Sequence, residues 1–326
     1  MANVYLQKNR EQRVYGGHPW VFRSDIDHVE GQARDGSVVR VLSSRHKFLG
    51  MAVYNPRSQI TLRMLSRRDI SINSDFIHQR VKRAVDYRRK FADLHSCRLI
   101  FAESDELPAV IADCFGDVIV LQVLCLGMEA FKQDIVDALV EELHPQGIYE
   151  RSDVPVRELE GLEQTTGLLY GAVPDKVEMV ENGVRFLVDV KEGQKTGFFL
   201  DQKENRAAIA PFVKESRVLD CFTHTGSFAL NAAKGGAARV TAADISAEAI
   251  AMAKRNAERN NLDNMDFLCE DTFALLPRLE KEGHPYDFII LDPPAFTKAR
   301  RTVENAMRGY KEINYRAMKL LPRGGY

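Results

Sequence analysis

The segment RVLDCFTHTGSFAL, from Arg217 to Leu230, decides the fold of this chain. An apolar strand ends at Asp220, a loop with a single glycine follows, and the apolar residues then recur at helical spacing. Farther along, three more apolar strands, RVTAAD, NMDFLCE and YDFIILD, alternate with helical segments. This alternation predicts a parallel sheet with crossover helices. Such open α/β sheets bind ligands at the carboxyl ends of their strands.

An aspartate follows each of these four strands: Asp220, Asp244, Asp271 and Asp292. The aspartates are about one strand–helix unit apart, so we expect their carboxylates along one edge of the sheet. A single aspartate at a strand end is commonly a cap or turn residue, but four in register indicate a ligand site. The first loop lacks the G-x-G-x-x-G pattern of dinucleotide sites, and Asp220 would repel a pyrophosphate, which disfavours a dehydrogenase.

An acidic loop favours a cationic ligand. S-adenosylmethionine (SAM) carries a sulfonium and an ammonium group and no phosphate, so it fits this loop better than a dinucleotide does. We expect Gly226 to let the backbone approach the ligand, Asp244 to accept hydrogen bonds from the ribose hydroxyls, and Asp271 to accept from the adenine amino group. We expect His224 to fill the loop rather than act as a base, and Cys221 to pack in the core.

The fourth strand ends in DPPAF, Asp292 to Phe296. The consecutive prolines Pro293 and Pro294 remove two N–H donors and fix φ at both positions. We therefore expect them to hold the side chain and carbonyl of Asp292 rigidly at the edge of the pocket. Phe296 is a candidate surface for stacking a base.

The residues before the α/β domain show different sequence patterns. Residues 1–72 are predicted to form a small β-rich domain, because SVVRVLSS, KFLGMAVYN and QITLRMLS alternate apolar and polar residues. Residues 73–190 are predicted to form an α+β domain. It begins with a basic helix over 74–95 capped by Ser74, and a second helix runs from Met128 to Leu143. Residues 191–326 then hold the α/β domain.

Charge and cysteine content narrow the class of protein. Residues 1–90 contain 18 Lys and Arg against 8 Asp and Glu, whereas the rest of the chain contains 27 against 38. A basic N-terminal region is typical of a protein with a polyanionic partner. The five cysteines form no CxxC pair, the start of the chain has no apolar core of a signal peptide, and the longest apolar stretch, Val118 to Met128, is too short for a membrane span. We expect a cytoplasmic protein with no metal and no membrane partner.

Several motifs together resemble those of class I SAM-dependent methyltransferases: VLDCFTHTGSFAL, AADISAEAI, CEDTF and IILDPPAF. The segment VKEGQKTGFFLDQKENR (Val190–Arg206) resembles the entry segment of the ribosomal RNA large-subunit cytosine-C5 methyltransferases. YGGHPWVFRSDI (Tyr15–Ile26) resembles the start of that family's PUA domain, and ERSDVPVRELEGL (Glu150–Leu162) a part of its central domain. The resemblance covers essentially the whole chain. It implies a PUA barrel, a central EEHEE domain, a Rossmann-like catalytic domain, SAM as cofactor and large-subunit ribosomal RNA as partner.

The resemblance also implies roles for individual residues. Contact with SAM is expected for Lys195, Thr196, Gly197, Phe198, Phe199, Asp201, Asp220, Gly226, Asp244 and Asp271. Asp292, Pro293 and Pro294 would face the target base. The RNA side would include Trp20, Arg80, Lys82, Arg83, Arg88, Arg89 and Phe296. A place for Trp20 in the barrel core stays open, and alternation would bring only one of Phe198 and Phe199 near the ligand.

Methylation of cytosine at C5 commonly uses a cysteine thiolate that adds to C6. The resemblance implies that this cysteine follows a fifth strand, whereas the sequence ends at Tyr326, where that strand would begin. We therefore expect a C-terminally truncated sheet of four strands without the nucleophile, in which YDFIILD is an open, aggregation-prone edge.

Two other functions stay open on the sequence alone. A rigid Asp-Pro-Pro could direct methyl transfer to an exocyclic amino nitrogen. An RNA-binding assembly factor could keep the methyltransferase fold without catalysis. The oligomeric state is also open, including a homodimer.

Overall fold

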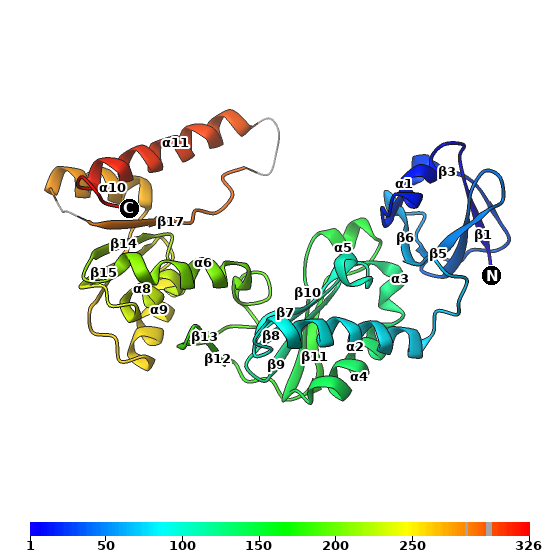
Figure 1. Cartoon of the computed structure of the whole chain (residues 1–326), viewed down its shortest axis with the longest axis horizontal. Coiled ribbons are helices and arrows are strands. Elements are labelled where there is room, and N and C mark those ends of the chain that lie inside the picture. Colours follow the sequence, from blue (N-terminus) through cyan, green and yellow to red (C-terminus); the bar gives the residue numbers. More distant parts are fainter. Residues whose placement is uncertain (284–285, 298–301) are drawn as a thin grey trace. The chain divides into compact units, whose positions relative to one another are not determined.

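The computed structural model describes residues 1–283, 286–297 and 302–326, and the chain divides into two compact units (Figure 1). The first unit comprises residues 1–177 and 188–198, and the second comprises residues 178–187 and 199–326. The predicted domain boundary at residues 190 and 191 falls within the segment 188–198, which groups with the first unit.

The first unit begins with a six-stranded sheet in the order β2-β6-β5-β4-β1-β3. Its strands are β1 (Asn3–Leu6), β2 (Trp20–Phe22), β3 (Ile26–Glu30), β4 (Val38–Leu42), β5 (Phe48–Tyr54) and β6 (Ile60–Ser66). Neighbouring strands are antiparallel except β1 and β4. Alternate residues such as Val39, Val41 and Leu62 share one core, to which the short helix α1 (Glu11–Tyr15) adds Val14.

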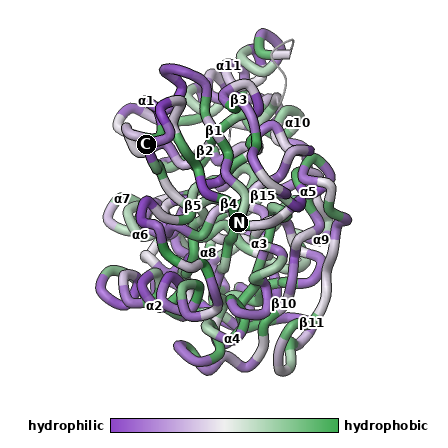
Figure 2. The backbone as a smooth tube through the Cα atoms, turned by 90° about the vertical axis from the view of Figure 1, so that its right-hand side faces the viewer, coloured by the Kyte–Doolittle hydropathy of each residue, from purple (hydrophilic) through white to green (hydrophobic). Residues whose placement is uncertain are grey.

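The basic helix α2 runs over Ser74–Phe91 and ends earlier than the predicted residue 95, because Ala92 is extended. The predicted cap is wrong by one residue. The side chain of Asn73, and not that of Ser74, accepts a hydrogen bond from the Phe76 amide at 3.0 Å. Most of the helix is hydrophilic (Figure 2). Its apolar stripe, which includes Ile77, Val81 and Val85, is buried.

A second sheet in the first unit has the order β11-β10-β9-β8-β7. Its strands are β7 (Ser96–Phe101), β8 (Val110–Phe115), β9 (Val118–Val123), β10 (Gly147–Ser152) and β11 (Thr165–Gly171). Three helices accompany it: α3 (Leu126–Glu129), α4 (Lys132–Leu143) and α5 (Val156–Leu159). The single helix predicted from Met128 to Leu143 is therefore wrong, because α3 and α4 are separate. Helices α2 and α4 share one buried core with the strands.

The second unit contains the predicted parallel sheet, in the order β16-β15-β14-β17. The strands are β14 (Arg217–Cys221), β15 (Arg239–Asp244), β16 (Met265–Cys269) and β17 (Phe288–Leu291). Helices α8 (Ser227–Lys234), α9 (Ala247–Arg259), α10 (Thr272–Glu282) and α11 (Val303–Leu320) connect or follow them (Figure 1). The short helices α6 (Lys203–Ala208) and α7 (Ala210–Val213) precede the sheet, and β12 (Val177–Glu181) pairs with β13 (Val184–Val188).

The outer edge of β17 is not fully open, which corrects one expectation. The Tyr326 amide donates to the Asp287 carbonyl at 3.0 Å, and the Ile289 amide donates to the Tyr326 carbonyl at 2.9 Å. The last residue therefore already pairs beside β17. No helix in the described ranges is both long and apolar enough to cross a membrane.

Candidate cofactor and substrate site

The loop between β14 and α8 is built around the buried carboxylate of Asp220. One oxygen of this carboxylate accepts from the Thr223 hydroxyl at 2.6 Å and from the Ala229 amide at 3.0 Å. Ala229 lies in the first turn of α8, so the carboxylate ties the end of β14 to the start of the helix. Asp220 is predicted to contact the cofactor. In the structure its carboxylate makes its hydrogen bonds to the loop and to the first turn of α8, and these bonds position the loop.

Burial is the main cause that raises the pKa of Asp220 to about 7; the hydrogen bonds from Thr223 and Ala229 oppose the rise, and the charges of Asp292 and Asp244 add to it. A carboxyl group in this state carries a proton through much of the range below neutral pH. Burial also lowers the pKa of His224, against the charge of Asp244. A neutral imidazole fits the prediction that His224 fills the loop.

The backbone of this loop is tightly folded. Phe222, His224 and Gly226 all have positive φ, at 64°, 51° and 85°. A Cβ on Gly226 would lie 2.3 Å from Leu230 Cδ1, so glycine is required here by sterics as well as by φ. At Gly226 the loop therefore places backbone without a side chain near the carboxyl end of β14.

Sequence reasoning missed two residues at this loop, Asn256, which holds it, and Thr225, which lies within it. Asn256, fully buried in α9, donates from Nδ2 to the Thr225 carbonyl at 3.0 Å and accepts from the Leu187 amide at 2.8 Å. The Thr225 hydroxyl is buried with no hydrogen-bond partner in the part of the chain that the structure describes. The sequence carries one signal for Asn256, which is a polar residue among the apolar positions of the amphipathic helix α9. An unpaired buried hydroxyl is what a ligand-binding loop leaves for its ligand.

The other predicted carboxylates follow their strands as expected. Asp244 is half-buried at the end of β15, where it accepts from the His224 amide at 2.8 Å and from the Ser246 amide at 2.9 Å. Asp271 is exposed and caps α10 by accepting from the Phe273 amide at 3.0 Å. Asp292 is exposed directly after β17. The parallel register of β14, β15 and β17 brings these strand ends to the same sheet edge.

Phe296 lies in an aromatic cluster. Its ring centroid is 4.4 Å from that of Tyr310, 5.7 Å from that of Phe273 and 6.4 Å from that of Phe222. The Tyr310 hydroxyl also accepts from the Phe296 amide at 3.3 Å. Phe296 is therefore half-buried, with neighbours that fix its ring, rather than a free stacking surface.

The segment from Lys195 to Asp201 divides between the two units. In the first unit, the Thr196 hydroxyl donates to Asp113 at 2.7 Å, Phe198 is buried, and Gly197 has a φ of 126°. In the second unit, the half-buried Phe199 ring meets the His224 ring edge-on at 5.3 Å. Phe198 is thus buried and Phe199 lies beside the β14–α8 loop, but this segment consists of turns and bends and is not the strand on which the alternation argument relied. Lys195 and Asp201 are exposed.

The basic residues predicted to face RNA lie in very different surroundings. Arg88 donates to Asp105 with both terminal nitrogens, one at 2.7 Å, and its side chain is 13% exposed. Lys82 and Arg89 both pair with Glu142. Trp20 is half-buried, and its indole N–H donates to Glu103 at 2.7 Å. Arg80 and Arg83 pair with Glu106.

Comparison with known proteins identifies the family. Residues 4–67 match a family model described as a PUA-like domain, and residues 162–326 match a model described as an S-adenosylmethionine-dependent methyltransferase. The chain is 44% identical over 332 residues to ribosomal RNA large subunit methyltransferase I of Vibrio vulnificus, covering 99% of this chain and 84% of the relative. The corresponding protein of Pseudoalteromonas atlantica is 41% identical with the same coverage.

The chain belongs to the ribosomal RNA large subunit methyltransferase I family. The predicted resemblance is thereby confirmed, together with a PUA domain, a Rossmann-like methyltransferase domain and SAM as the cofactor. A solved structure described as a SAM-dependent methyltransferase from Streptococcus mutans shares this fold, with a TM-score of 0.80 and 24% identity, over 99% of this chain and 83% of that one. Another methyltransferase structure, complexed with SAH, gives a TM-score of 0.82 at 24% identity, over 100% of this chain and 84% of that one.

These matches give no support to a truncated methyltransferase domain or to a missing nucleophile segment, so both remain predictions from the sequence. The methyltransferase site itself fits its cofactor. It offers an unpaired Thr225 hydroxyl, a glycine that admits close backbone approach, and carboxylates suited to hydroxyl and amino donors. Among the described residues, no group of three or more His, Cys, Asp or Glu is arranged to hold a metal ion.

Proposed function

We propose that this chain transfers the methyl group of SAM to C5 of a cytosine in large-subunit ribosomal RNA. The observation that carries the proposal is 44% identity across 84% of a relative named for large-subunit ribosomal RNA methylation. The β14–α8 loop and the aspartates after β15 and β17 supply a site on which such chemistry can occur. A ribosomal RNA substrate would place the activity in the cytoplasm.

The cofactor would be held at the carboxyl ends of β14, β15 and β16. Asp244 would accept from the ribose hydroxyls with the lone pairs that its two amide contacts leave free. Asp271 would accept from the adenine amino group, and Gly226 and Thr225 would line the amino-acid end. Bound there, SAM supplies an electrophilic methyl group. Asp220 would act from behind the loop as a positioning residue, while contacts from the segment Lys195–Asp201 remain predictions.

The target base would meet Asp292. Its side chain is exposed at the end of β17, and Pro293 and Pro294 restrict the backbone that follows. The Tyr310 hydroxyl lies 3.5 Å from the Pro294 carbonyl and donates to it, which anchors the strand exit to α11. Asp292 would therefore accept a hydrogen bond from the base, while the restricted backbone at the end of β17 keeps its carboxylate in a fixed position.

Methylation at an exocyclic nitrogen remains the second candidate because most of the thiols are buried. C5 transfer needs a nucleophile on C6, whereas four of the five cysteines are buried and only Cys269 is exposed. The covalent step is therefore not assigned to a residue of this sequence. A nitrogen acceptor needs no thiol, only an oxygen acceptor such as that of Asp292.

The test is transfer of tritium from labelled SAM to large-subunit ribosomal RNA isolated from cells that lack the gene, followed by mass spectrometry of the nucleosides. We expect 5-methylcytidine. A methylated exocyclic nitrogen would overturn the C5 assignment and support the second candidate. Absence of label from a protein that is folded and binds SAM would support a non-catalytic RNA-binding factor.

Two variants make this assay specific for the proposed site. Asp292→Ala is expected to lower the transfer rate at least about 100-fold with little change in SAM affinity, as loss of a group that acts on the reacting base. Asp263→Ala removes an exposed aspartate from the loop before β16, at the opposite end of that strand, and should transfer at the wild-type rate.

A further inference from the structure

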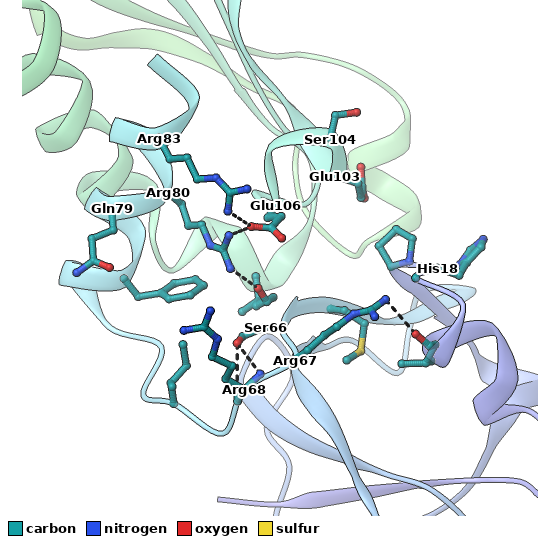
Figure 3. A pocket seen from close by; sticks show the side chains of 17 residues that line it. His18, Ser66, Arg67, Arg68, Gln79, Arg80, Arg83, Glu103, Ser104 and Glu106 are labelled. Atoms are coloured by element: carbon teal, nitrogen blue, oxygen red, sulfur yellow. Dashed lines mark hydrogen bonds and ion pairs between the residues drawn. The ribbon is translucent and has the colours of Figure 1, made fainter. Parts of the chain in front are cut away.

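The first unit contains a cavity of about 770 Å³ that the sequence did not predict (Figure 3). Its walls come from the loop after α1, the end of β6 with the loop that follows, the first half of α2, and the turn over residues 103–106. Its charged lining consists of Arg67, Arg68, Arg80, Arg83, Glu103 and Glu106. We call this cavity the arginine groove.

The two carboxylates of the arginine groove do not neutralise its four guanidinium groups. Arg80 and Arg83 share a single partner, Glu106, as the dashed lines of Figure 3 show. Glu103 accepts from Trp20 and from Arg63, a residue outside the groove lining. The groove therefore has an excess of positive charge.

Arg67 and Arg68 carry most of that excess. Arg67 donates to the Val14 carbonyl at 3.2 Å, and neither arginine forms an ion pair within the described ranges. Both are exposed, as is the side chain of Arg83 at 74%. Burial lowers the pKa of Arg80, and the neighbouring charges of Arg83 and Arg68 lower it further, which is the mark of guanidinium groups crowded together.

Three of the remaining basic residues of α2 are paired with carboxylates, and a fourth, Lys90, is exposed but does not line the groove. Arg88 is held by Asp105, and Lys82 and Arg89 are paired with Glu142 and Asp86. Apart from Lys90, the positive charge that the sequence attributes to the whole helix is therefore concentrated at one place. That place is the end of α2 that faces the loop carrying Arg67 and Arg68.

We propose that the arginine groove binds the phosphate backbone of the RNA substrate through Arg67, Arg68 and Arg83. The proposal rests on the proposed function, which makes the substrate an RNA. Guanidinium groups bind phosphate with two parallel hydrogen bonds, and a shared carboxylate leaves further donors on Arg83 for this purpose.

The experiment compares two triple variants of the full chain that lose the same charge. The groove variant is Arg67→Gln, Arg68→Gln and Arg83→Gln. The control variant is Arg34→Gln, Arg45→Gln and Lys90→Gln, three exposed residues of the same unit that do not line the groove. Affinity for a fragment of large-subunit ribosomal RNA is measured by fluorescence anisotropy over a range of salt concentrations, and SAM affinity by calorimetry.

We expect the groove variant to bind RNA about 10- to 100-fold more weakly, with a log–log salt slope that is less steep by about 2, since each phosphate contact contributes about 0.7 to the slope. The control variant should keep nearly the wild-type affinity and slope, and both should bind SAM like the wild type. Wild-type RNA affinity in the groove variant, or an equal loss in both variants, would overturn the proposal. Groove-dependent RNA binding without methyl transfer would refute the proposed function and leave the groove assignment standing.

Discussion

At the scale of single residues, the carboxylate of Asp220 shows how the cofactor loop is stabilised. It is one of the most buried charged groups of the second unit, at 1% exposure, and its pKa is raised to about 7. Its ordinary value in an unfolded chain is about 3.9. The folded state therefore holds a proton between about pH 4 and pH 7 that the unfolded state does not.

This linkage predicts that the free energy of unfolding falls as the pH rises from about 4 to about 7, and that the contribution of Asp220 levels off above pH 7. Between pH 5 and pH 8 the contribution is roughly 2 to 3 kcal/mol. Urea unfolding of the wild type and of Asp220→Asn at both pH values checks this. The variant should lose that part of the pH dependence, and an identical pH dependence in the two proteins would show that Asp220 does not retain a proton.

Asp244 is the residue whose predicted contact is most specific. Replacing it by alanine would remove charge-assisted hydrogen bonds to the ribose worth about 1.5–3 kcal/mol, so SAM affinity should fall about 10- to 100-fold. It would also free the His224 and Ser246 amides. Asp244→Asn keeps one acceptor oxygen and should show an intermediate loss. Calorimetry of both variants tests the ribose assignment, which unchanged affinity in Asp244→Ala would contradict.

At the scale of elements, the turn from β14 into α8 depends on one glycine. Gly226 begins α8 at a φ of 85°, and a Cβ there would also lie 3.1 Å from Ala253 Cβ in α9. An added methyl group must therefore shift the Leu230 side chain and crowd Ala253, next to the loop that carries Thr225.

Gly226→Ala is expected to destabilise the protein by about 1–3 kcal/mol, the sum of a strained φ and overpacking, and to weaken SAM binding. Gly283→Ala is a matched control, because Gly283 ends α10 at a φ of 68° and no atom of the described residues lies within 4 Å of its added Cβ. The free energy of unfolding of that variant should fall by only about 1 kcal/mol, and its SAM affinity should stay unchanged. Thermal unfolding and calorimetry compare the two. Equal losses would mean that φ alone, and not the contact with Leu230, matters at Gly226.

At the scale of the whole molecule, the five thiols report on packing in both units. Cys97, Cys114, Cys125 and Cys221 are buried, and burial raises the pKa of Cys125 to about 12 and that of Cys221 further. Reactivity requires an accessible thiolate. We expect one thiol of the native chain to react rapidly with a disulfide reagent at pH 8, and five after denaturation. Loss of the rapid phase in Cys269→Ser would assign it, and two or more rapid thiols would contradict the burial of the others.

Patterns that repeat over a few residues were read correctly from the sequence. The strand–loop–helix order from Arg217 onward and the aspartates after the strands follow from alternation and helical spacing. The errors lie at the ends of elements. The helix cap at Asn73 and the break between α3 and α4 depend on single hydrogen bonds, which periodicity does not specify.

The sequence by itself determined the class of fold, the family and the loop that we propose to bind SAM. Each depends on short segments whose residues act on their neighbours in the chain. Only the tertiary structure decided which of those residues remain available to bind a ligand. It placed Thr196 against Asp113, Arg88 against Asp105 and Phe296 among other aromatic rings, and it gathered Arg67 and Arg68 beside Arg83. The physical reason is that hydrogen bonds, ion pairs and ring contacts join groups far apart in the sequence, so a side chain's free charge depends on partners that only folding brings near.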